Sequence, residues 1–397
     1  MKLINKGICA VSGVKAYGIK EGKYGLAIIE GSGYGAGVFT KNKFIAAPLI
    51  LTQKHLESSN NMLNAIIINS GNANAFTGEQ GFKDAENMAI LLADKLKVKK
   101  ESIGVASTGV IGRALNMDWI KNNIDRVFNN LTNSSKGCES AARAIMTTDT
   151  KLKQIAIELE SEVRIGGIAK GAGMIEPNMA TMLAFIYTDA FLEPNQLKKH
   201  LISAVDKSFN MIVVDGDTST NDMVLLTATC KKGKLDSVAS AEFQNGLEHV
   251  CIELAKMIAS DGEGATKLIE AKVIGALSEE DAKKAAKAIV RSPLVKTAIF
   301  GEDPNWGRVI AAVGYSNAKV DENKISLSFS NKNTEIALVK NGKVLKVEKE
   351  SNALLKEIMA SKEIDIIVDL GIGSSCANAY GCDLTYDYVK INAKYTT

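Results

Sequence analysis

The chain has 397 residues, enough for two or more lobes that each bury a core. Its 46% hydrophobic and 23% charged residues are typical of globular proteins, and its net charge of +3 is spread without a basic block. This pattern argues against nucleic acid and membrane surfaces as partners. The N-terminus lacks the apolar run of a signal peptide, and apolar stretches such as residues 65–68 are too short to span a bilayer, so we expect a cytoplasmic protein.

Short apolar runs, glycine-rich turns and helical stretches alternate over the first 180 residues. Residues 26–30, 65–69 and 102–106 are predicted to be strands that lead into glycine or Ser/Thr loops. Apolar residues at helical spacing predict one helix over about residues 83–96 and another that begins near Asp118.

A run of alternating glycines, residues 31–37, follows the first predicted strand. Its spacing is G-x-G-x-G-x-G, and a β-rich segment follows it where a dinucleotide-binding motif requires a helix. We therefore interpret these residues as turn glycines. The phosphate-binding pattern G-x-x-x-x-G-K-[ST] does not occur in the sequence.

The remaining chain also mixes strands and helices. Residues 163–168, 183–188, 211–214, 223–229, 324–329 and 334–339 are predicted strands. Residues 193–209, 242–258, 279–289 and 352–359 are predicted helices, the third capped by Ser278 with Asp281 three residues on. The mixture predicts an α+β fold in which helix layers pack on β-sheets.

Histidine and cysteine usage narrows the chemistry. His55, His200 and His249 each lie in a segment of helical periodicity, so none is a good candidate for a general base. The six cysteines form no C-x-x-C pair and are expected to be reduced thiols. Because no Cys/His cluster has ligand spacing, we expect no metal site.

For each of three polar loops the sequence allows both a structural and a functional role. Residues 70–74 suit either a turn or a polar substrate, because they combine small residues with side-chain amides. Residues 107–112 form either a plain turn or a set of N–H groups that face an oxyanion. Residues 215–222 hold three carboxylates, but Leu226 stands where a calcium loop needs a bidentate Glu, which favours a turn that frames a site.

Residues 170–183, with the letters K-G-A-G-M-I-E-P-N-M-A-T-M-L, are the most informative segment. This run resembles the self-cleavage site of the ornithine acetyltransferase (glutamate N-acetyltransferase) family, the arginine biosynthesis bifunctional type. The resemblance continues in the same order over nearly the whole chain, through residues 69–75, 107–112, 147–150, 215–222, 261–267, 303–308 and 381–388. So many motifs in one order make it highly specific.

The resemblance implies a self-processing enzyme of the N-terminal-nucleophile kind. Its cleaved bond is Ala180–Thr181, which divides the chain into an alpha chain, residues 1–180, and a beta chain, residues 181–397. In similar enzymes the two chains stay associated, and two such pairs form a heterotetramer.

Site roles follow from the same resemblance. Thr181 is the implied nucleophile, and Thr108 with Gly109 is the implied oxyanion hole. The implied substrate contacts are Thr147, Lys170, Thr181, Glu263, Asn392 and Thr397.

The chain departs from the family pattern in two places. Ile372 and Ser374 stand where the family is associated with Arg and Asp, and the stretch between Thr150 and Gly166 is shorter. Both departures bear on local geometry and substrate preference, and neither touches Thr181.

The chemistry of an N-terminal threonine fits a histidine-poor chain. Cleavage before Thr181 frees an α-amine, whose unperturbed pKa of about 7.7–8.0 lets it accept the hydroxyl proton near neutral pH. The expected reaction is ping-pong: N-acetylornithine acetylates Thr181, and glutamate collects the acetyl group. No cofactor is expected, and acetyl-CoA stays open as a second acetyl donor.

Two other functions compete with this one. A hydrolase or aminopeptidase would use the same threonine but pass the acyl group to water. A small-molecule binding protein would keep the fold without turnover.

Overall fold

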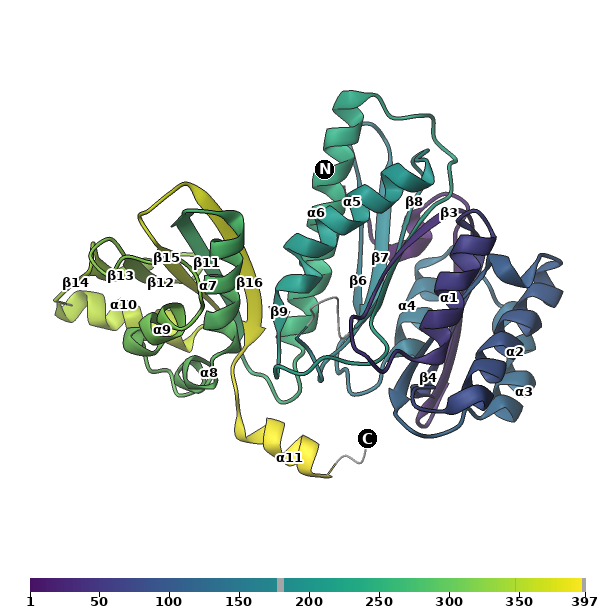
Figure 1. Ribbon diagram of the computed structural model, residues 1–397, viewed down its shortest axis with the longest axis horizontal. Coiled ribbons are helices and arrows are strands. Elements are labelled where there is room, and N and C mark those ends of the chain that lie inside the picture. The colour runs from purple at the N-terminus through teal and green to yellow at the C-terminus, as the bar shows by residue number, and fades with distance from the viewer. Residues whose placement is uncertain (177–181, 347, 395–397) are drawn as a thin grey trace.

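The computed structural model describes residues 1–176, 182–346 and 348–394, and two sheets lie side by side in it (Figure 1). In these residues the larger sheet has nine strands in the order β1-β6-β7-β8-β10-β3-β4-β5, with β2 paired to β3. Its strands are β1 (Lys2–Leu3), β2 (Lys15–Glu21), β3 (Tyr24–Phe39), β4 (Met62–Asn72), β5 (Ile103–Val110), β6 (Lys153–Glu158), β7 (Arg164–Lys170), β8 (Leu183–Thr188) and β10 (Met223–Ala228).

The smaller sheet, counted over the same described residues, has seven strands in the order β14-β13-β12-β15-β11-β16-β9. They are β9 (Ile212–Val213), β11 (Leu268–Ala276), β12 (Ser326–Ser330), β13 (Glu335–Lys340), β14 (Lys343–Val344), β15 (Glu363–Asp369) and β16 (Ser375–Cys382). The helices are α1 (Ala47–Ser58), α2 (Gly78–Leu96), α3 (Met117–Phe128), α4 (Ser135–Ile145), α5 (Pro194–Lys207), α6 (Ser237–Ser260), α7 (Glu279–Arg291), α8 (Pro293–Phe300), α9 (Trp306–Gly314), α10 (Lys349–Ala360) and α11 (Tyr386–Lys394). The predicted α+β fold is confirmed.

Strand β8 lies at the centre of the larger sheet and is buried along its whole length. Leu183, Phe185 and Tyr187 pack in the cluster that includes α4, whereas Ala184 and Ile186 pack in the cluster that includes α5 and α6. A strand covered on both faces reads as a continuous apolar run, which is why residues 183–188 were predictable from the sequence.

Strands from both sides of the predicted cleavage bond share the larger sheet. Strand β7 precedes the bond and pairs antiparallel with β8, with Lys170 opposite Leu183. Strand β10 pairs parallel with β8, with Met223 opposite Leu183. The boundary between residues 1–180 and 181–397 is therefore no boundary between sheets.

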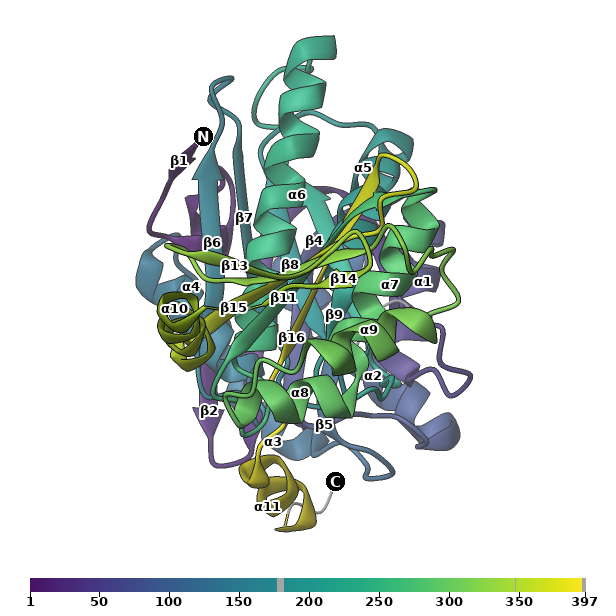
Figure 2. The same ribbon diagram turned by 90° about the vertical axis from the view of Figure 1, so that its left-hand side faces the viewer.

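Helix α6 joins the two sheets into one body. It contacts β6 and β7 of the larger sheet and β9, β11 and β16 of the smaller one. Helix α11 lies beyond the ends of both sheets in either view (Figures 1 and 2), and none of its residues is buried.

The structure corrects one of two expectations about loops. The glycine run of residues 31–37 lies inside β3 and forms no turn; an added Cβ at Gly33 would lie 1.9 Å from the Ala228 carbonyl oxygen, so the glycine permits close strand packing. The second loop agrees with its prediction: the strands expected around the polar loop 215–222 exist as β9 and β10, one in each sheet.

The predicted helices are all present, with small shifts at their ends. The predicted cap of α7 is confirmed, since the Ser278 hydroxyl accepts the Asp281 N–H at 3.1 Å. His55, His200 and His249 lie in α1, α5 and α6 as expected.

Candidate active site

A cavity of about 120 Å³ lies between strand ends of the larger sheet, the loop after α6 and helix α11. Six residues predicted from the sequence line it, and they come from five separate parts of the chain: Thr108, Gly109, Thr147, Lys170, Glu263 and Asn392. Met182 and Leu183, the first described residues after the predicted cleavage bond, line it too. Ala180, Thr181 and Thr397 lie outside the described residues.

Thr108 and Gly109 lie near the carboxyl end of β5, which runs four residues farther than predicted before it ends at Val110. Gly109 has φ +131°, and a Cβ there would lie 2.4 Å from the carbonyl carbon of Gly71. Only glycine fits this contact, so the residue type follows from the local backbone.

The asparagine side chains at the end of β4 and just after it form hydrogen bonds with backbone carbonyls. The side-chain amide of Asn69 donates to the Asn72 carbonyl at 2.9 Å, and that of Asn72 donates to the Ala114 carbonyl at 3.1 Å. Asn74 likewise donates to the Gly81 carbonyl at 2.8 Å. These amides hold the end of β4 in shape, which favours the turn interpretation of residues 70–74.

Lys170, the last residue of β7, brings a positive charge to the cavity. Its Nζ donates to the Thr147 hydroxyl at 2.7 Å and to the Thr108 hydroxyl at 3.2 Å. Burial lowers the pKa of Lys170, and the Asp149 carboxylate opposes that shift. Lys170 therefore links the predicted oxyanion hole to the predicted substrate contacts.

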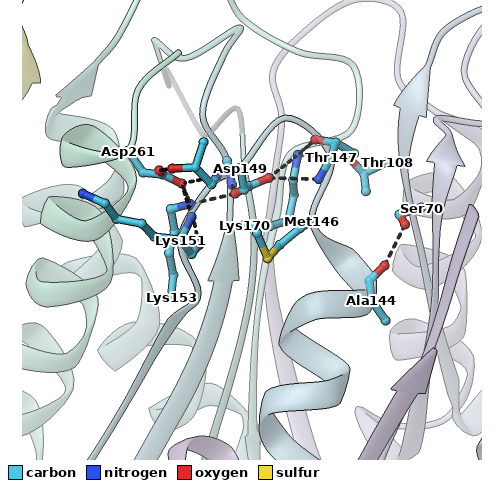
Figure 3. Close-up of polar contacts among 12 residues, drawn as sticks. Ser70, Thr108, Ala144, Met146, Thr147, Asp149, Lys151, Lys153, Lys170 and Asp261 are labelled. Carbon is cyan, nitrogen blue, oxygen red and sulfur yellow. Dashed lines mark hydrogen bonds and ion pairs between the residues drawn. The ribbon is translucent and has the colours of Figure 1, made fainter. Parts of the chain in front are cut away.

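Behind Lys170 lies an ion-pair network that our sequence interpretation did not assign to the site (Figure 3). The Lys153 ammonium pairs with Asp149 at 2.7 Å and with Asp261 at 2.5 Å, and all three side chains are at most 2% exposed. Burial opposes the charge of Asp149, but Lys170 and Lys153 outweigh it and hold the pKa of this carboxyl well below its usual range. The available signal was that Asp149 and Asp261 belong to the motifs that carry Thr147 and Glu263.

Asp222, a second carboxyl that the sequence interpretation missed, lies in the cavity wall and is 1% exposed. Its Oδ2 has no hydrogen-bond partner among the described residues. Burial raises the pKa of Asp222 well above its ordinary value, although the hydroxyls of Thr40 and Ser219 favour the ionised form. Asp222 therefore combines a raised pKa with a buried oxygen that has no partner among the described residues.

The polar loop 215–222 frames the segment before the predicted cleavage bond. The Asp215 carboxylate accepts the backbone N–H groups of Met174 at 2.6 Å and Ile175 at 2.7 Å. Among the described residues, no group of three His, Cys, Asp or Glu side chains is placed to hold a metal ion. Loop 215–222 thus acts on the chain itself, as a turn that frames the site.

Glu263 and Asn392 close the cavity on the side of the smaller sheet. The Asn392 amide donates to Glu263 Oε2 at 2.9 Å, and the Glu263 N–H donates to the Ala172 carbonyl at 2.8 Å. The cavity therefore offers a cation, Lys170, and a carboxyl group, Glu263, on different walls, with hydroxyls and a glycine turn between them.

None of the three histidines lines this cavity. Among the helices that the structure describes, none has the length and apolar character of a membrane span. The described cysteines are all free thiols.

Known proteins resemble the chain over its full length. A model of the ArgJ family matches residues 11–397. The glutamate N-acetyltransferase of Methanosarcina acetivorans is 56% identical over 398 residues, which take in 100% of both chains. The arginine biosynthesis bifunctional protein ArgJ of Archaeoglobus fulgidus is 48% identical over 390 residues, 98% of this chain and 100% of that protein.

A crystal structure of arginine biosynthesis bifunctional protein argJ from Bacillus halodurans is similar to part of the chain. It shares 44% sequence identity with a TM-score of 0.50, and the match covers 54% of this chain and 100% of the crystallised one.

Proposed function

This chain belongs to the ArgJ family of arginine biosynthesis, and on that premise we propose that it carries the acetyl group of N-acetylornithine to glutamate as an ester on Thr181. One observation carries the proposal. Residues from five separate parts of the chain, Thr108 to Asn392, meet around one cavity, and the two residues that follow Thr181 line the same cavity.

The first proposed step is cleavage of the Ala180–Thr181 bond, which gives Thr181 a free α-amine. The Bacillus halodurans chain supports this step, because it is matched in full yet spans 54% of this chain, close to the share of residues 181–397. Pairing of β7 with β8 and of β3 with β10 holds the fragments in one sheet, so they are expected to separate only on denaturation.

Acetyl transfer then proceeds through two tetrahedral intermediates. The Thr181 hydroxyl attacks the acetyl carbonyl of N-acetylornithine, and its proton passes to the α-amine of the same residue. The C–N bond breaks, the ornithine amine leaves with that proton, and an acetyl ester stays on Thr181. The glutamate amine attacks this ester, and the hydroxyl is restored as N-acetylglutamate leaves.

The cavity walls suit each part of this reaction. Thr108 and Gly109, which line the cavity, are the proposed donors to the oxyanion, and one such donor contributes about 3–4 kcal/mol in a transition state. Lys170 is the proposed partner of a substrate carboxylate, and Glu263 is the proposed partner of the ornithine ammonium.

Thr181→Ala tests the proposal. The alanine variant should neither cleave itself nor transfer acetyl groups, while Thr181→Ser, which keeps a hydroxyl, should cleave slowly and retain weakened transfer. Undiminished transfer by Thr181→Ala would remove Thr181 as the carrier. The kinetic pattern in N-acetylornithine and glutamate would then change from parallel to intersecting lines.

Two rival functions have their own outcomes. Acetate as the sole product from N-acetylornithine and glutamate would mark a hydrolase. A chain that stays uncut and binds ornithine without turnover would mark a binding protein.

Further properties are proposed on the same premise. We propose a cytoplasmic enzyme that assembles as a dimer of alpha–beta pairs, without a cofactor. Release of free thiol from acetyl-CoA in the presence of glutamate would establish acetyl-CoA as a second donor.

A further inference from the structure

The Asp149 carboxylate is bonded in four directions, all within the described residues. Its Oδ1 accepts the Lys153 ammonium at 2.7 Å and the Gly171 N–H at 2.6 Å. Its Oδ2 accepts the Thr147 N–H at 3.0 Å and lies 3.9 Å from Lys170 Nζ. One buried carboxylate thus contacts the strand end that carries Lys170 and the loop that carries Thr147 (Figure 3).

The network continues away from the cavity to Asp261 at the end of α6. Asp261 accepts Lys153 Nζ at 2.5 Å, the Thr150 N–H at 3.0 Å and the Lys151 N–H at 3.2 Å. A carboxylate at a helix C-terminus is disfavoured by the helix dipole. The bonds to Lys153 and to residues 150 and 151 explain why it lies there.

Charges alternate along this path: Lys170, Asp149, Lys153 and Asp261 carry +, −, + and −. Of the other titratable groups that face Lys170, Glu263 and Asp222 lie in the cavity wall, and Lys20 approaches from β2. Burial and Lys153 act against the charge on Lys170, and Asp149 is the strongest influence in its favour. Loss of the Asp149 charge would leave two buried ammonium groups without their shared counter-ion.

We propose that Asp149 is a positioning residue that keeps Lys170 protonated and orients it, together with Thr147, toward the substrate carboxylate. The proposal rests on the proposed function, because it assigns the carboxylate as the group that Lys170 meets. Asp149 has no contact with the substrate itself and acts through Lys170, Thr147 and the backbone of Gly171.

Asp149→Asn is the test, since asparagine keeps the shape and removes the charge. We expect kcat/KM for glutamate to fall about a hundredfold at neutral pH, the order of loss that follows misplacement of a substrate contact. We also expect the alkaline limb of the pH profile to move to lower pH, because Lys170 loses its proton more easily without the Asp149 charge.

Asp261→Asn is the matched control. It removes a charge from the same network but leaves all four contacts of Asp149 in place. It should lower the melting temperature and leave the alkaline limb where the wild type has it. If Asp149→Asn also left the limb unmoved, Asp149 would be a structural residue only and the proposal would be wrong.

A double variant guards against failure to fold. Asp149→Asn with Lys153→Met removes the buried pair together, so that no ammonium is left unpaired behind the cavity wall. It should show a smaller shift of the alkaline limb in the same direction, because the loss of Lys153 also removes a charge that acts against Lys170, though more weakly than Asp149 acts for it. A folded double variant with a wild-type limb would overturn the proposal. Transfer by Thr181→Ala would instead overturn the proposed function, whereas an inactive Thr181→Ala with an unshifted Asp149→Asn limb would overturn this inference alone.

Discussion

Two walls of the cavity each bury an aspartate, and the pKa values of the two carboxyl groups are shifted in opposite directions. Behind one wall, Asp149 has a lowered pKa and accepts hydrogen bonds from two backbone N–H groups and a lysine. In the other wall, Asp222 has a raised pKa, and its Oδ2 has no partner among the described residues. Both side chains are at most 1% exposed, so burial alone does not set the charge.

The difference lies in what surrounds each carboxyl. Desolvation disfavours the ionised form at both positions. At Asp149 the ammonium groups of Lys170 and Lys153 and the backbone N–H donors outweigh it. At Asp222 the hydroxyls of Thr40 and Ser219, the Met182 N–H and the Lys170 ammonium do not. The Asp222 wall therefore keeps a buried oxygen without a hydrogen-bond partner among the described residues.

Of the substitutions that test this comparison, Asp149→Asn should have the largest effect on stability. We expect a loss of about 3–5 kcal/mol in the free energy of unfolding at neutral pH, because Lys153 and Lys170 lose a buried partner. The folded-state pKa of Asp149 lies below its unfolded value, so its stabilisation is complete above that unfolded value and is lost as the pH falls through the folded one. Urea denaturation should therefore show a deficit that is constant above about pH 5 and narrows below about pH 4, near the unfolded pKa of about 3.9. A constant deficit at every pH would contradict the ionised state.

Lys153→Met should have a smaller effect. We expect a loss of roughly 3 kcal/mol in the free energy of unfolding, the low end of the range for breaking a buried ion pair. Asp149 and Asp261 lose their shared cation, but each keeps backbone N–H donors. Urea midpoints of the two single variants and of the double variant form a cycle. Its coupling energy should be favourable by more than about 1 kcal/mol, and additive losses would contradict a direct Asp149–Lys153 interaction.

Asp222→Asn should have the smallest effect, within about 1 kcal/mol at neutral pH, because a neutral amide replaces an already neutral acid. The pH dependence has the opposite sign. The folded-state pKa of Asp222 is raised, so the wild type loses stability as the pH rises from the unfolded pKa through the folded one. Over that pH range the melting temperature of the variant should rise relative to that of the wild type. If it fell further below the wild-type value instead, Asp222 would be ionised in the folded protein.

The sequence predicts the elements whose pattern is strong. Strand β8 is a continuous apolar run, and α7 carries both an apolar face and a serine cap. Helix α4 was not predicted, although its buried residues, Ala141 and Ala144 among them, lie on one face. Those small residues let it approach β2, where a Cβ on Gly18 would lie 2.6 Å from the Ala144 side chain.

The site residues that belong to local sequence motifs could be predicted. The ion pairs between residues far apart in the sequence could not. Thr108, Lys170 and Glu263 stand in recognisable motifs, and the structure brings them to one cavity. The pair between Lys153 and Asp261 joins residues 108 positions apart, and no local pattern signals it. Likewise, Asp222 Oδ2 lacks a hydrogen-bond partner among the described residues because of how the fold packs around it, and no sequence pattern indicates this.

Intact mass spectrometry of the purified protein, incubated with N-acetylornithine in the absence of glutamate, tests the central claim most directly. The account predicts a C-terminal fragment that begins Thr-Met-Leu-Ala at residue 181, carries one acetyl group as an ester, and loses it when glutamate is added. An uncut chain, or a fragment that stays unmodified while N-acetylglutamate accumulates, would contradict it.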